Sequence, residues 1–187
     1  MQNKLLILLL IAAHLVFPSL SSAATPKIFG NLDFIKNNII VNLSVAGAAE
    51  LESAIKSGIK KEITFTVELI RQWKFWPDEF VVSKKIRKIV NYDNLREQYW
   101  ASSFDGVIFM ERQFNNYQIM RDWIFTVNAV NIANVKELDP GDYYIRIVVE
   151  SKTINPVPVM GLLIHLIPEV EMSLAKESQP FFIGDKK

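Results

Sequence analysis

Apolar and polar residues alternate along several short stretches of this chain, which is the pattern of β-strands with one buried face. The clearest stretch is 63–76, where apolar residues at 63, 65, 67, 69, 73 and 75 alternate with Thr, Glu, Gln and Lys at 64, 66, 68, 72 and 74. β-branched and aromatic residues at this period suit a half-buried sheet. We therefore expect Trp73 and Phe75 to continue the inward row, and Trp76 to point outward beside Pro77.

Turn residues divide the rest of the chain into further strands. Lys36-Asn37-Asn38 is expected to connect the first two, because Asn tolerates left-handed backbone, and Asp105-Gly106 is a strong hairpin signal. The other predicted strands are 28–35, 38–45, 80–92, 97–101, 107–114, 132–138, 143–151, 171–176 and 181–183. The apolar run 161–167 favours neither a helix nor a strand.

Two segments change to a helical period. Residues 48–57 carry one apolar stripe, two early Glu and a following Gly58, which predicts a helix with a glycine C-terminus. Asn115 or Asn116 is expected to cap a second helix that runs through Val127. With eight to ten short strands around them, the pattern predicts a mostly β fold: an antiparallel β-sandwich-like domain with about two helices in its connections.

The first residues have the three parts of a secretory signal. Lys4 precedes an apolar run of 13 residues, 5–17, and Pro18 then leads to the small residues Ser22-Ala23-Ala24. We expect residues 1–24 to be a removable signal peptide and residues 25–187 to form a single exported β-rich domain. The alternative is an uncleaved anchor, but a spanning helix needs about 20 apolar residues. No integral membrane span is therefore expected after cleavage.

Charge and cysteine content narrow the possible partners and the compartment. Cleavage would remove Lys4, one of 21 Lys and Arg, and none of the 20 Asp and Glu, so the mature chain would be formally neutral. Neutrality argues against nucleic acid as a partner, since phosphate binding needs a basic surface. The absence of cysteine excludes disulfides and favours an exported, periplasmic protein of bacteria.

Residues for catalysis or metal binding are scarce. His14 would leave with the signal peptide, and His165 lies inside an apolar run. One histidine without cysteine leaves few zinc sites and few nucleophilic triads, and no phosphate-binding glycine motif occurs. We therefore predict no catalytic residue, no metal site and no cofactor. The acid pairs Asp139/Asp142 and Asp78/Glu79 fit turns, with calcium binding or acid–base chemistry as the alternative.

A cluster of aromatic and basic residues is the best candidate for a binding surface. In 71–77, three large aromatic residues and two cations lie near a hairpin tip, a composition found at binding hot spots and membrane interfaces. We select Trp76, Arg71 and Lys74 as candidate binding residues. The alternatives are the edge of the core and a membrane contact. The basic residues of 84–88 are expected to be a solvated face that pairs with acids such as Glu68.

The order of these features resembles an uncharacterised bacterial family of exported proteins, domain of unknown function 4390. The likeness covers most of residues 38–183. It is carried by 39–45, by the glycine-ended helix 51–58, by 65–76 with its VELIRQWKFW, by VNYDNL at 90–95 and by LDPGDYYIRI at 138–147. The resemblance implies bacterial export and a sandwich-like domain. It also implies a link to envelope signalling, through members encoded near sensor-kinase genes, and brings no catalytic residue with it.

Together these features predict a non-catalytic binding or adaptor module of the bacterial cell envelope, linked to envelope signalling, with an unidentified envelope protein as its partner. The alternative from another class is a carboxylate-based envelope hydrolase. That activity would need a cleft in which two or more buried acids converge.

Overall fold

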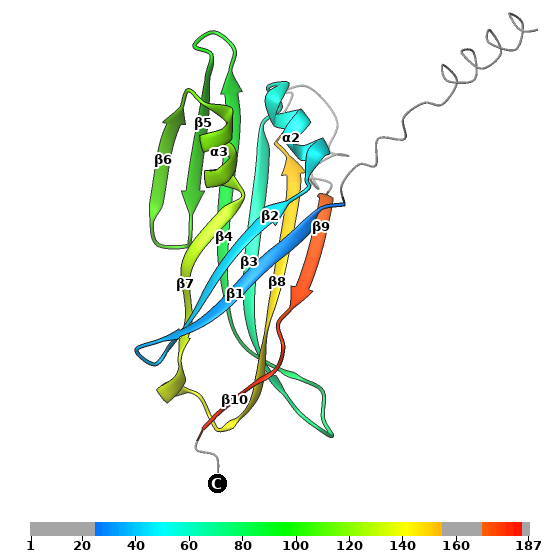
Figure 1. Ribbon diagram of the computed structural model, residues 1–187, viewed down its shortest axis with the longest axis vertical. Coiled ribbons are helices and arrows are strands. Elements are labelled where there is room, and N and C mark those ends of the chain that lie inside the picture. The colour runs from blue at the N-terminus through cyan, green and yellow to red at the C-terminus, as the bar shows by residue number, and fades with distance from the viewer. Residues whose placement is uncertain (1–24, 155–169, 185–187) are drawn as a thin grey trace, which may run out of the picture.

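Two antiparallel sheets packed face to face make up the described part of the protein (Figure 1). The computed structural model describes residues 25–154 and 170–184. In chain order the elements are β1 (Lys27–Ile35), β2 (Asn38–Ala46), α2 (Ala49–Lys56), β3 (Lys61–Gln72), β4 (Glu79–Asp93), β5 (Gln98–Phe104), β6 (Phe109–Phe114), α3 (Tyr117–Ile124), β7 (Thr126–Asn134), the 3₁₀ turn η1 (Val135–Glu137), β8 (Gly141–Thr153), β9 (Val170–Glu177) and β10 (Phe181–Ile183). The predicted mostly β, sandwich-like fold with two helices in connections is confirmed.

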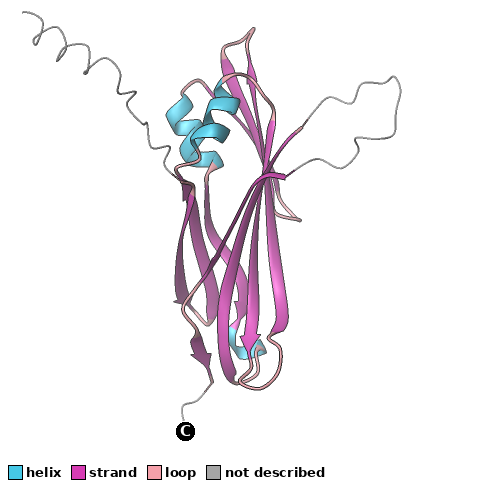
Figure 2. Cartoon of the chain, turned by 90° about the vertical axis from the view of Figure 1, so that its right-hand side faces the viewer, coloured by secondary structure: helices cyan, strands magenta, loops and turns pink. Residues whose placement is uncertain are grey.

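The two sheets differ in width. The smaller has the order β1-β2-β7, and the larger has the order β10-β8-β3-β4-β5-β6, with β9 paired to β8. Seen from the side, the layers lie against each other and both α-helices lie at one end (Figure 2). The β3–β4 hairpin lies at the opposite end (Figure 1).

The smaller sheet follows directly from its sequence pattern. Lys36 and Asn37 have φ of 49° and 65°, so the two residues between β1 and β2 adopt the left-handed backbone that the Asn content predicts. In β2, Ile39, Val41 and Leu43 are buried, and the residues between them are half-buried. The alternating row therefore faces the other sheet, as expected.

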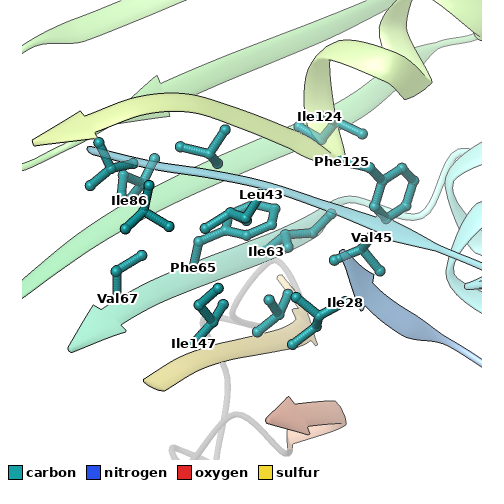
Figure 3. Packing of buried hydrophobic residues seen from close by; sticks show 14 of the residues in the cluster. Ile28, Leu43, Val45, Ile63, Phe65, Val67, Ile86, Ile124, Phe125 and Ile147 are labelled. Atoms are coloured by element: carbon teal, nitrogen blue, oxygen red, sulfur yellow. The ribbon is translucent and has the colours of Figure 1, made fainter. Parts of the chain in front are cut away.

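Strand β3 is the centre of the larger sheet, because β4 and β8 pair with it on either side. Its inward row is fully buried and consists of Ile63, Phe65, Val67 and Leu69. Phe65 and Ile63 lie beside Leu43 of the small sheet in the core (Figure 3), and all four residues of the row belong to one buried cluster with Leu43 and Val45. Burial of such a row is the main favourable contribution to folding, at ~25 cal/mol per Å² of apolar surface.

The tip of this hairpin departs from the prediction. Strand β3 ends at Gln72, and Trp73 and Phe75 are 40% and 93% exposed, so their expected inward, core position was wrong. A register shift between Leu69 and Ile70 already changes the pairing with β4, which continues only to Arg71. Beyond Gln72 the chain leaves the sheet, and the Trp73 N–H donates to the Asp78 carboxylate at 3.2 Å.

The second helix is shorter than predicted. Asn116 caps it, since its side-chain oxygen accepts from the Ile119 N–H at 3.2 Å, which settles the choice between Asn115 and Asn116. The helix ends at Ile124 rather than Val127, because the Phe125 carbonyl accepts from the Val45 N–H at 3.0 Å and β7 begins at once. The strand predicted at 132–138 accordingly spans Thr126–Asn134.

The first helix and the remaining strands follow their predicted positions, with ends shifted by a few residues. Gly58, after α2, has a φ of 82°, as a C-terminal glycine requires. The predicted signal peptide 1–24, His165 and the run 161–167 lie outside the described residues. Within the described part of the chain, no helix is both long and apolar enough to cross a membrane.

Phe65 is the side chain on which we expect stability to depend most. It is fully buried at the centre of β3, so Phe65→Ala should lower the free energy of unfolding by ~3–5 kcal/mol. Thr66→Ala, on the outward face of the same strand, should cost less than about 1 kcal/mol. Urea denaturation of both variants measures the difference, and equal losses would contradict the assignment of faces.

Candidate functional site

Four aromatic side chains are exposed at the β3–β4 hairpin, and we call Trp73, Phe75, Trp76 and Phe80 the aromatic tip. Their exposed fractions are 40%, 93%, 76% and 60%. The prediction that Trp76 points into solvent is confirmed. Large aromatic residues are rarely left this exposed in a group, and clusters of this kind occur at contact surfaces.

Asp78 holds the backbone of the aromatic tip. One carboxylate oxygen accepts from the Trp73 N–H at 3.2 Å, and the other accepts from the Tyr144 hydroxyl at 3.1 Å. Tyr144 belongs to β8 and is buried. Burial, and then the hydrogen bond to Asp78, raise the pKa of Tyr144, so the hydroxyl remains a donor at neutral pH. The loop is thus tied to the sheet by side chains.

Arg71 lies beneath the tip and reaches the β7–β8 connection. Its guanidinium donates to the Pro140 carbonyl at 2.9 Å, lies 3.5 Å from the Asp139 carboxylate and stacks over the Trp73 ring at 4.3 Å. The side chain is 17% exposed. These contacts engage Arg71 within the protein, and they account for Asp139 as a structural acid in a turn.

Glu79 completes the support of Trp73. Its carboxylate accepts from the indole N–H at 3.3 Å and lies 4.0 Å from the Arg71 guanidinium. Of the three candidate binding residues, Trp76 and Lys74 are therefore exposed at the tip, and Arg71 supports the tip from below. Phe80 was not selected from the sequence, although its place at the start of an alternating strand was visible.

The expected exposure of the basic residues at 84–88 is correct for Lys84, Lys85 and Arg87 and wrong for Lys88. Lys88 is 5% exposed and lies on the inward row between Ile86 and Val90. Glu68 pairs instead with Arg146 of β8, at 3.8 Å. The alternation of the strand already places Lys88 in one row with Ile86 and Val90. The sequence interpretation instead grouped Lys88 with the three cations beside it.

Lys88 serves as a cap for α3. Its ammonium group donates to the carbonyl oxygens of Trp123 and Thr126, both at 2.5 Å, and lies 4.5 Å from the centre of the Trp123 ring. A cation near the last carbonyls of a helix is favourable. Burial, with a smaller effect of Arg112, lowers the pKa of Lys88 from 10.5 to about 8.

Acidic side chains in the described residues do not gather into a catalytic or metal-binding group. Within residues 25–154 and 170–184, no group of three or more His, Cys, Asp or Glu side chains is placed to hold a metal ion. Glu62 is the one buried acid in these ranges, and it lies 3.0 Å from the Lys152 ammonium. Asp142, the partner of Asp139 in the predicted acid pair, is exposed.

Replacement of two tip tryptophans tests how the tip is built. Trp73→Ala should lower the free energy of unfolding by about 1 kcal/mol, because the ring is half-exposed but stacked on Arg71. Trp76→Ala should change it by less than about 0.5 kcal/mol. If urea denaturation instead showed that Trp73→Ala lowers the free energy of unfolding by ~3–5 kcal/mol, Trp73 would have to be a core residue.

The pKa of Lys88 predicts a specific pH dependence of stability. Between about pH 8 and 10.5 the unfolded chain binds more protons at this position than the folded protein, so this group increases stability as pH rises through that range. The gain is on the order of 3 kcal/mol. The neutral amine keeps two N–H donors for the two carbonyls.

Lys88→Met should remove this gain. The free energy of unfolding, measured in urea at about pH 7.5 and about pH 10.5, should rise more in the native protein than in the variant, whatever the other groups contribute. The same change in both proteins would show that Lys88 keeps an ordinary pKa in the fold.

Comparison with known proteins gives a single kind of match. The family model described as "Domain of unknown function (DUF4390)" matches residues 36–160, a range that includes the aromatic tip, its supporting contacts and Lys88. Neither the curated proteins nor the solved structures contain a match to the chain. Because the model covers more than half of the sequence, from the β1–β2 turn past the end of β8, the chain belongs to the DUF4390 family.

Proposed function

We propose that this protein is a non-catalytic binding or adaptor module of the bacterial cell envelope, and that the aromatic tip is its contact with an envelope protein. The observation that carries the proposal is the exposure of Phe75 and Trp76 on a loop that is fixed from below. Because the backbone of the loop is already fixed, less conformational freedom is lost on binding, so more of the burial of these side chains is available as affinity.

The chemistry of the tip suits a protein partner. Trp is among the residues most enriched at interface hot spots, where it fills a pocket of the partner. Lys74 is exposed next to Phe75 and Trp76, and adds a cation at the rim, where a charge steers association. Arg71 acts here as a positioning residue, since its hydrogen bonds and ion pairs are made within the chain.

Export and periplasmic location belong to the same proposal. They rest on the signal-like pattern at 1–24 and on the absence of cysteine from the sequence. A role in envelope signalling is an extension of it that rests on resemblance alone. The carboxylate-based hydrolase receives no support from the described acids, since Glu62 and Glu171 each contact a lysine.

Site-specific crosslinking in living bacteria tests the proposal. A photoreactive amino acid at position 75 should capture a defined envelope protein, and the additional change Trp76→Ala should reduce the captured amount by about tenfold or more, because a hot-spot tryptophan contributes ~2 kcal/mol or more to binding. Captured proteins are identified by mass spectrometry.

Leu95 provides the matched control. It is 97% exposed, in the β4–β5 turn at the other end of the molecule, where α2 and α3 lie (Figure 1). A photoreactive group there should not capture the same protein. The same capture from position 95, or capture from position 75 that is indifferent to Trp76→Ala, would refute a contact at the tip.

A further inference from the structure

A groove of about 700 Å³ opens between the two sheets where the wider one extends beyond the narrower one. Strand β7 forms one wall, through residues 128–131. The other wall is the β5–β6 hairpin, which includes Ile108 and Met110, and Trp123 of α3 lies at one end. We call this the β6–β7 groove.

Three cations in and beside the groove have no carboxylate within ion-pair distance among the described residues, and the exposed Lys84 is one of them. Lys88 lines the groove, and two of its three N–H groups have acceptors, the carbonyls of Trp123 and Thr126. Arg112 lies on the groove side of β6, with its guanidinium 5.8 Å from the centre of the Trp123 ring. None of the three belongs to the ion pairs of the described chain.

The acids of the groove are already engaged. Asp105 accepts from the Val107 and Ile108 N–H groups at 2.9 and 2.7 Å, which lowers its pKa. Asp122 lies 3.5 Å from the Arg121 guanidinium. A buried cation without a counter-charge is costly, so the groove is electrostatically complementary to an anion.

The wall that carries Arg112 is also a free strand edge. Within residues 25–154 and 170–184, β6 pairs with β5 alone. Its outer edge therefore presents unpaired backbone N–H and C=O groups, to which an extended peptide can add. An acyl chain cannot hydrogen-bond to these groups, so the edge favours a peptide over a lipid.

A second copy of the chain fits this edge poorly. Antiparallel pairing of two β6 strands about a twofold axis aligns residues that face the same side of the sheet. If the twofold axis passes through the middle of β6, two copies of Glu111 or two copies of Arg112 lie directly opposite each other. Like charges in that position are destabilising.

From these observations we propose that the β6–β7 groove binds an extended segment of another protein, which pairs with the free edge of β6 and presents a carboxylate to Arg112, with Lys88 adding positive charge deeper in the groove. The site is separate from the aromatic tip. An apolar side chain of the same segment would cover Ile108 and Met110, which are 57% and 45% exposed.

Synthetic peptides test this proposal directly. The probe is a fluorescein-labelled peptide of about eight residues, alternating Val and Thr, with one central Asp in the Val row. A matched peptide has Asn in place of Asp, and a third carries N-methyl groups on alternate amides. By fluorescence anisotropy the Asp peptide should bind about tenfold or more tightly than the Asn peptide, and N-methylation should abolish binding.

Variants of the protein locate the contact. Arg112→Gln should reduce the preference for the Asp peptide at least about fivefold. Lys88→Met removes a more distant cation and should reduce it less, with its folding checked by urea denaturation. Lys85→Gln removes the same charge from the outward face of β4 and should leave binding unchanged. Trp76→Ala should also leave it unchanged, which separates this site from the tip.

Three results would overturn the inference. Equal binding of the Asp and Asn peptides would show that the cations play no part. If Lys85→Gln lost the preference for the Asp peptide as much as Arg112→Gln does, the preference would reflect only the overall charge of the protein. Undiminished binding of the N-methylated peptide, with displacement by dodecanoate, would assign the groove to an anionic amphiphile.

Discussion

A three-stranded sheet cannot cover a seven-stranded one, and this mismatch determines where the molecule is closed and where it is open. The small sheet covers β3 and its neighbours, where the inward rows are fully buried. Beyond β4 the inner face needs another cover. Helix α3 provides it at one end, and its last turn is fixed by Lys88 from the sheet below. The remainder of that face is the β6–β7 groove.

Much of the fold could be predicted, because a strand with one buried face has apolar residues at every second position of its sequence. The rows of β2 and β3 and the turns at Asn37 and Gly106 follow from local chemistry. The end of α3 could not be predicted in the same way. The Phe125 carbonyl is taken up by the Val45 N–H of β2, a partner some 80 residues away that no local window includes.

The candidate site was predictable in composition and not in geometry. The aromatic and basic residues of 71–77 marked the tip, and Trp76 is exposed as expected. The position of Trp73 depends on a register shift after Leu69 and on the hydrogen bond to Asp78. Neither feature can be recognised from the alternation of apolar and polar residues. Arg71 appeared available in the sequence, yet Asp139 and Pro140, about 70 residues later, engage it.

The division of the hairpin into supporting and exposed side chains bears on how such a protein diversifies. The backbone of the tip is fixed by Asp78 and Tyr144, and Arg71 supports the Trp73 ring. Phe75 and Trp76 project from this frame, so they can be exchanged without disturbing the frame or the core. Under the proposed function, selection could therefore change partner preference at these positions independently of foldability, and the same scaffold would gain a new specificity by replacement of two neighbouring side chains.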